Sequence, residues 1–98
     1  MLVLGLQGSP RKKGNTHILL SAFLEEAEAL GARTRQVRVP GKEISPCQEC
    51  GACERKGYCA IQDDMQEIYP LLWEADLIVL ATPIFFYGPT AQIKALID

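Results

Sequence analysis

The chain has 98 residues, 48% of them hydrophobic and 22% charged, which fits one small globular domain and is too apolar for a disordered chain. Ten Lys and Arg residues against twelve Asp and Glu give a net charge of −2. This argues against nucleic acid as a partner, because backbone binding needs clustered positive charge. The longest apolar stretch, residues 77–87, is too short to cross a bilayer, and the N-terminus lacks a signal-peptide pattern. We therefore expect a cytoplasmic protein that does not contact membranes.

The first elements predicted from the sequence are a strand, a loop and a helix. Residues 2–6 form a continuous apolar run, the pattern of a strand that is covered on both faces. A polar loop rich in Gly and Pro follows at residues 8–14. A helical apolar stripe then begins, for which Asn15 or Thr16 is the expected N-cap and Gly31 the expected left-handed stop.

Two more strands frame a long loop and a second helix. Residues 34–39 alternate in polarity, which predicts a strand near the sheet edge, and residues 40–62 form a long functional loop without periodicity. Two aspartates at residues 63–64 open the second helix, which Pro70 is expected to kink or divide. Residues 77–81 form the most apolar strand, which we expect at the centre of the sheet.

A last helix begins at Thr90 and completes the order strand, helix, strand, loop, helix, strand, helix. This alternation predicts an α/β fold with parallel strands and right-handed crossovers, built as one domain over residues 1–98. Three strands make a small sheet for this class, and the last helix reaches Asp98 without a stop signal. We therefore expect these residues to be the N-terminal part of a larger domain.

The loop between the first strand and the first helix has the composition of an anion site. A helix N-terminus offers N–H groups without intrahelical partners and a partial positive charge. Ser9, Asn15 and Thr16 add hydrogen-bond donors there, and Arg11 adds a bidentate cation, a set that suits a terminal phosphomonoester. The pattern matches neither a Walker A loop nor a dinucleotide fingerprint. The alternative is a solvated turn followed by a capped helix.

A second loop, rich in aromatic residues, follows the strand at residues 77–81. Both loops leave the carboxyl ends of strands that should be neighbours, which is where ligands bind in open α/β sheets. Three consecutive aromatic residues beside Pro83 and Gly88 offer flat surfaces and backbone N–H groups for a planar heterocycle. The alternative is that Phe85 and Phe86 only close the end of the hydrophobic core. Together the two loops favour one ligand with a phosphate and a planar ring.

All four cysteines fall within the loop at residues 40–62, at Cys47, Cys50, Cys53 and Cys59. Without an export signal, such crowded cysteines indicate metal or redox use rather than disulfides. The spacing C-x2-C-x2-C-x5-C lets three thiolates converge on one face of a cuboidal iron–sulfur cluster while the fourth closes it. Gly51 and Gly57 give the backbone freedom to wrap. Zinc bound by the thiolates and free thiols stay as alternatives.

The order of these motifs resembles that of the NADPH-dependent FMN reductase and iron–sulfur flavoprotein family. The resemblance is carried by residues 8–16, the cysteine loop, residues 63–65, residues 75–76 and residues 82–88. It implies a flavodoxin-like three-layer sandwich with a parallel sheet in the strand order 2-1-3-4-5. The chain supplies the first three of these strands, and so corresponds to the N-terminal half of the family's domain.

The resemblance also implies roles for individual residues. FMN would be the cofactor, with its phosphate bound by Ser9, Arg11, Asn15 and Thr16. Its isoalloxazine ring would be lined by Pro83, Ile84, Phe85, Phe86 and Gly88. A 4Fe–4S cluster would be held by Cys47, Cys50, Cys53 and Cys59.

These implied cofactors predict an FMN-binding oxidoreductase that transfers electrons as a homo-oligomer. The flavin would take an electron pair from NAD(P)H or from a ferredoxin-like partner and pass the electrons on singly through the cluster. No residue has the pattern of a general base or nucleophile, which electron transfer at a flavin does not require. The alternative is a non-catalytic module, either stabilised by zinc or a cluster or used for interaction. One observation supports this alternative: residues 77–81 become an exposed hydrophobic edge when no further strand follows.

Overall fold

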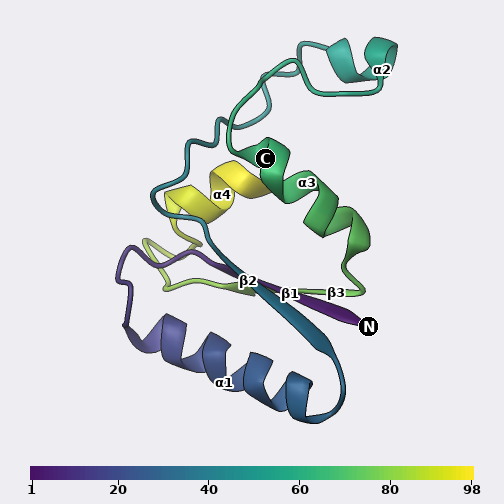
Figure 1. The fold of residues 1–98 in the computed structure, drawn as a ribbon. Helices are drawn as coiled ribbons and strands as arrows, with labels where there is room; N and C mark the ends of the chain where they lie inside the picture. The colour runs from purple at the N-terminus through teal and green to yellow at the C-terminus, as the bar shows by residue number, and fades with distance from the viewer.

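The computed structural model describes residues 1–98 and contains one parallel sheet between two layers of helices (Figure 1). Its strands are β1 (Leu2–Gln7), β2 (Arg33–Arg38) and β3 (Leu77–Ala81), and they lie in the order β2-β1-β3. β1 pairs in parallel with both neighbours. A crossover that contains at least one helix joins consecutive strands, as parallel pairing requires.

β1 forms the centre of the sheet, and all six of its residues are buried. β3 lies at an edge of the sheet, where Leu77, Ile78 and Leu80 are 43–47% exposed. The prediction that residues 77–81 lie at the centre is therefore wrong for this chain. A continuous apolar run indicates covered faces but does not show how many strands lie beside it. The predicted exposed edge at these residues and the predicted edge position of the strand near 34–39 are both confirmed.

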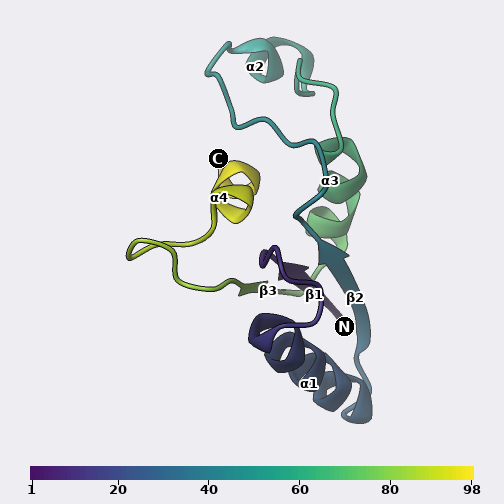
Figure 2. The same cartoon turned by 90° about the vertical axis from the view of Figure 1, so that its left-hand side faces the viewer.

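Helices cover both faces of the sheet. α1 (Asn15–Ala29) lies on one face, and α3 (Met65–Glu74) and α4 (Ala91–Ile97) lie on the other (Figure 1 and Figure 2). The core under α1 consists of Val3, Leu20 and Leu24. The larger core on the opposite face consists of Leu4, Leu6, Val37, Val39, Met65, Ile68, Ile93 and Leu96. This arrangement confirms the predicted α/β class, a three-layer sandwich around a parallel sheet. None of the helices combines the length and the apolar character that crossing a bilayer requires.

The start of α1 differs from the predicted capping. Gly14 is the N-cap, in an extended conformation, and no side chain caps the helix, so the prediction of Asn15 or Thr16 as the cap is wrong. A Cβ on Gly14 would come within 3.2 Å of the Arg11 side chain, which shows how tightly the loop folds before the helix. At the other end, Gly31 has a φ of +96°, so the predicted left-handed stop is confirmed.

α3 runs without interruption through Pro70. Of the two outcomes predicted for this residue, a kink or a division of the helix, division is therefore wrong, and a kink stays a prediction. Pro70 lies on the exposed face, where the carbonyl that loses its hydrogen bond can reach water, whereas Met65 and Ile68 are buried in the core. The N-cap of α3 is Asp64, which makes no side-chain cap hydrogen bond. Oδ1 of the preceding Asp63 accepts a hydrogen bond from the Met65 N–H at 2.9 Å, so both aspartates lie at the start of the helix as predicted. The cysteine loop contains a further helix, α2 (Ala52–Lys56), which is too short to show an apolar period in the sequence.

Candidate functional site

Gln7, the last residue of β1, organises the loop at residues 8–14. The residue is 1% exposed, and its Oε1 accepts a hydrogen bond from the Ser9 N–H at 2.7 Å. Its Nε2 donates to the Arg11 carbonyl at 3.2 Å, so one amide group bonds to two points of the loop. Sequence reasoning passed over Gln7. The signal that could have found it is a polar residue at the end of a buried apolar run, because such a group needs hydrogen-bond partners.

Ser9 and the start of α1 carry the donors of the predicted anion site. Ser9 is 4% exposed, and its Oγ accepts a hydrogen bond from the Arg11 N–H at 3.2 Å, which leaves its own hydrogen free to donate. The first helical hydrogen bond runs from the Ile18 N–H to the Gly14 carbonyl at 3.1 Å. The N–H groups of residues 15–17 precede it and have no intrahelical partner. The loop therefore offers a hydroxyl and several N–H groups to an anion.

Thr90, the N-cap of α4, ties the two loops together. It has no exposed surface, and its Oγ1 donates to the Gly8 carbonyl at 2.8 Å and accepts from the Ile93 N–H at 3.3 Å. Its own N–H donates to Oγ1 of Thr82 at 3.0 Å. The Gly8 N–H donates to the Ala81 carbonyl at 2.8 Å. These bonds hold the loop after β1 against the loop after β3.

Gly8 lies where no side chain fits. A Cβ at this position would lie 1.9 Å from Cγ1 of Ile93, a residue of α4 that is 1% exposed. Because glycine has no Cβ, the backbone of the loop at residues 8–14 can lie directly against α4. We call this loop the anion loop, after the anion that the sequence predicts there. The contact fixes the distance between the loop and this helix.

Arg38, the last residue of β2, anchors the anion loop from the other side. Its Nη2 donates to the Pro10 carbonyl at 2.9 Å, and its Nη1 donates to the Pro40 carbonyl at 2.5 Å. Its Nε is buried without a hydrogen-bond partner. The guanidinium therefore fixes two backbone carbonyls and also places a positive charge beside the anion loop.

A cavity of about 400 Å³ lies between the two loops, at the carboxyl ends of β1 and β3. Its volume falls within the range of small-molecule sites. It is lined by Ser9, Pro10, Arg11, Gly14, Asn15, Thr16, Pro83 and Phe85. The structure thus brings together the four residues predicted for a phosphate and two of those predicted for a planar ring. Their binding of a ligand stays a prediction.

The tip of the aromatic loop lies outside this cavity. Phe85 and Gly88 exchange backbone hydrogen bonds of 2.8 and 3.0 Å around a turn in which Phe86 and Tyr87 have φ values of 48° and 65°. Phe86 is 97% exposed and Ile84 is 81% exposed. Phe86 therefore does not close the end of the core. The ring contacts predicted for Ile84, Phe86 and Gly88 stay predictions.

The cysteine loop projects away from the sheet, with α2 at its far end (Figure 1 and Figure 2). Gly51 and Gly57 flank α2, and both have a φ of +78°, so the backbone uses the conformational freedom predicted for these glycines. The exposed cysteines are Cys47, Cys50 and Cys53, and Cys59 is partly buried. The loop thus keeps most of its thiols accessible to solvent.

Three of the four cysteines, together with Tyr69 of α3, help to line one cavity of about 660 Å³: Cys47, Cys53 and Cys59. Cys50 does not line this cavity, and no three Cys, His, Asp or Glu side chains lie close enough together to bind a metal ion jointly. Partial burial, and next the neighbouring Cys59 thiol, raise the pKa of Tyr69 above its usual value. The chemistry of the donor set fits an iron–sulfur cluster or zinc, whereas the thiols are not gathered into a site.

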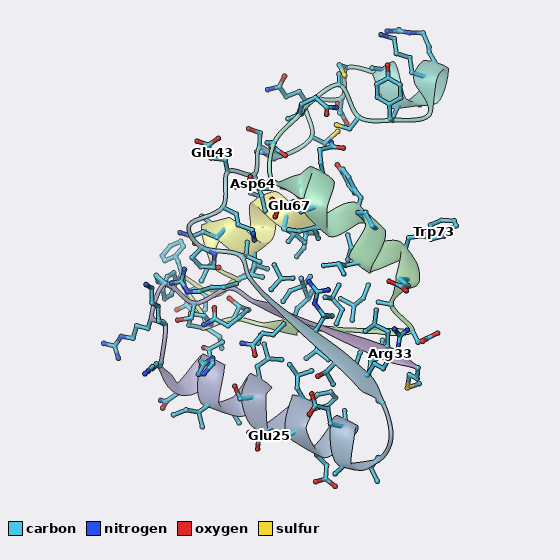
Figure 3. The ribbon with its side chains drawn as sticks, viewed as in Figure 1. Glu25, Arg33, Glu43, Asp64, Glu67 and Trp73 are labelled. Atoms are coloured by element: carbon cyan, nitrogen blue, oxygen red, sulfur yellow. The ribbon has the colours of Figure 1, made fainter.

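Two aspartates fix the near end of the cysteine loop. Oδ2 of Asp63 accepts a hydrogen bond from the Ser45 N–H at 2.7 Å, and Oδ2 of Asp64 accepts one from the Glu43 N–H at 2.7 Å. Glu43 and Asp64 lie together beyond the N-terminal end of α3 (Figure 3). Residues 43–45 therefore form a fixed base from which the cysteine loop extends.

The strand order reverses between β1 and β3, and the cavity lies at the carboxyl ends of these two strands. This combination defines an open α/β protein with its candidate ligand site at the topological switch point. The sequence model of the NADPH-dependent FMN reductase family matches residues 1–98, and the chain belongs to this family.

Curated relatives match the whole chain. An iron-sulfur flavoprotein of Methanosarcina thermophila is 42% identical over 98 residues, which cover 100% of this chain and 51% of that protein. An iron-sulfur flavoprotein of Archaeoglobus fulgidus is also 42% identical over 98 residues, which cover 100% of this chain and 44% of that protein. One of Methanocaldococcus jannaschii is 41% identical over 98 residues, with 51% of that protein covered and all of this chain. The chain thus spans about half the length of these curated relatives.

Proposed function

We propose that this chain binds FMN, with the phosphate in the loop at residues 8–16 and the ring against the loop at residues 82–88. The observation that carries the proposal is the shared cavity of about 400 Å³, which Ser9 and Arg11 line from one loop and Phe85 from the other. The family match and the names of the relatives, iron-sulfur flavoproteins, also support it.

The phosphate end of the cavity supplies donors of several kinds. The free hydrogen of the Ser9 hydroxyl and the N–H groups of residues 15–17 can donate to phosphate oxygens. Arg11 adds a cation with paired donors, and the dipole of α1 adds a partial positive charge. Because these groups all act on the phosphate, we expect the affinity of the site to depend on it.

The ring end supplies apolar surface on a loop whose start is held in place. Pro83 and Phe85 line the cavity, and Phe85 is 50% exposed, which leaves ring surface for stacking. The hydrogen bond from Thr90 to Thr82 holds the start of this loop in place. We propose Ile84, Phe86 and Gly88 as further ring contacts, which requires the loop tip to turn toward the cavity.

When bound, FMN would supply the electron-transfer chemistry of an oxidoreductase, and the residues of this chain would bind and orient it. We propose NAD(P)H or a ferredoxin-like protein as the electron donor. We also propose that Cys47, Cys50, Cys53 and Cys59 hold a 4Fe–4S cluster. The spacing and thiol chemistry of the four residues support this proposal. Cys50 would have to join the three cysteines that share a cavity.

Titration of the full chain with FMN, followed by quenching of flavin fluorescence, tests the main proposal. We expect saturable quenching, and binding of riboflavin that is weaker by about tenfold or more, because riboflavin lacks the phosphate. Arg11→Ala is expected to reduce the preference for FMN. Lys13→Ala is the matched control, since Lys13 is an exposed cation of the same loop that does not line the cavity. A lack of quenching at saturating protein concentration overturns the proposal.

A further inference from the structure

We propose that Gln7 is a positioning residue that sets the affinity of the anion loop for phosphate, an inference that rests on the FMN binding proposed above. Gln7 is buried and does not line the cavity, so it acts through the loop and not by touching the ligand. Its amide bonds to the Ser9 N–H and to the Arg11 carbonyl. These two bonds bracket the segment that carries two of the phosphate-binding candidates.

The first bond decides which donor Ser9 presents. Because Oε1 of Gln7 accepts the Ser9 N–H at 2.7 Å, this backbone donor is already occupied. The Ser9 hydroxyl accepts from the Arg11 N–H at 3.2 Å, which leaves the hydroxyl hydrogen as the donor of Ser9 toward the cavity. Without the Gln7 bond, the turn from Ser9 to Arg11 would lose the contact that holds its first residue.

The second bond removes a repulsive group from the anion site. A free carbonyl carries partial negative charge, and an anion loop binds best when its carbonyls are bonded elsewhere. Nε2 of Gln7 donates to the Arg11 carbonyl at 3.2 Å, and Nη2 of Arg38 donates to the preceding carbonyl, that of Pro10, at 2.9 Å. Two side chains thus occupy two successive carbonyls, and Gln7 supplies the buried half of this arrangement.

Glutamine is suited to both bonds because its planar amide carries an acceptor and a donor on one group. Methionine has a similar length but offers neither a strong acceptor nor a donor. Glutamate keeps the acceptor for the Ser9 N–H. When ionised, however, it has no donor for the Arg11 carbonyl and adds negative charge beside the phosphate. These two substitutions therefore separate the bonding role of Gln7 from its role in filling space.

The test compares FMN with riboflavin in the full chain and in two variants, by the fluorescence titration described above. We expect Gln7→Met to weaken FMN binding about tenfold while the affinity for riboflavin is unchanged. Gln7→Glu is expected to weaken FMN binding further and again to leave riboflavin binding unchanged. Gln92→Met is the control because it removes an exposed amide on α4 that does not line the cavity, and it should keep both affinities.

The two proposals fail in different ways. A wild-type chain that binds neither flavin overturns the FMN proposal itself. A wild-type chain that prefers FMN, with variants that keep this preference, overturns only the role of Gln7. Equal losses for FMN and riboflavin in the folded Gln7→Glu variant also overturn that role, because they indicate general damage to the cavity. Circular dichroism of each variant establishes that the titrated protein is folded.

Discussion

Gly8 is a point at which the backbone of the anion loop packs directly against α4. Its N–H bonds to the end of β3, and its carbonyl bonds to the hydroxyl of Thr90. The space beside its Cα is filled by Ile93. A side chain at this position must displace either the loop or the helix, and both movements change the cavity. A substitution at this one residue is therefore expected to change both the stability of the fold and the shape of the cavity.

Gly8→Ala is expected to lower the free energy of unfolding by about 1–3 kcal/mol, the usual effect of an overfilled core. The reason is the distance of 1.9 Å between the added Cβ and Cγ1 of Ile93. Chemical denaturation followed by circular dichroism measures the change. In an Ile93→Ala background, which removes the colliding atom, the same substitution is expected to cost less. Equal costs in the two backgrounds would show that the collision is not the cause.

Among the helices and strands, the sequence correctly predicts those that have a long apolar pattern of their own. The three strands and α1 have apolar runs or stripes, and their predicted bounds agree with the structure to within a residue or so. Two predictions that depend on the surroundings of a residue are wrong: the division of the helix at Pro70 and the central position of residues 77–81. Pro70 is tolerated because it faces water, and the position of β3 in the sheet depends on which strands lie beside it.

The candidate site likewise has features that the sequence predicts and features that it does not. The composition of the two loops predicts that they face one cavity, because the ends of neighbouring parallel strands meet at one edge of the sheet, and six of the nine predicted residues line it. The bonds that shape the cavity come from Gln7, Thr90 and Arg38, and several of them join residues far apart in the sequence. No local pattern of residues reveals the distant partners of Arg38 and Thr90, whereas Gln7 bonds to residues two and four positions along the chain. The helix α2 within the cysteine loop is unpredicted because it is too short to show an apolar period.

The cluster proposed for the cysteine loop can be tested by the metal content of the protein. We expect protein prepared without oxygen to contain about four iron atoms and a similar amount of acid-labile sulfide per chain. Cys50→Ser is expected to lower both, because it removes one ligand of the proposed cluster. Lys56→Ser, an exposed substitution in the same loop, should leave the iron content unchanged. Zinc in place of iron would overturn the cluster but keep a metal site, and a chain free of both metals would overturn the site.

The molecule exposes apolar surface along β3 and beside it. Its side chains are partly exposed along the edge of the sheet, and the edge continues into a cavity of about 260 Å³ next to α1. Apart from Gly31, this cavity is lined by hydrophobic side chains, those of Met1, Val3, Phe23, Ala27, Leu30, Ala32 and Leu77. Surfaces of this kind on an unpaired strand favour pairing with other chains.

We therefore expect the chain to self-associate through the β3 edge. Ile78→Lys places a charge at a position that is 44% exposed on this strand and is expected to shift the chain toward the monomer. Sedimentation velocity over a range of protein concentrations measures the shift. Gln36→Lys, on the opposite edge of the sheet, is the matched control and should leave the association unchanged. Association that is insensitive to Ile78→Lys would place the contact elsewhere.

The two edges of the sheet differ in chemistry, so a further strand is expected at only one of them. β2 presents the charged side chains of Arg33 and Arg35 at its border, and such charges discourage a neighbour, whereas β3 carries no charge at all. Any added strand, from the same polypeptide or from another copy, is therefore expected beside β3. That edge leads into the aromatic loop, so we expect whatever extends the sheet to lie beside the cavity proposed for the flavin.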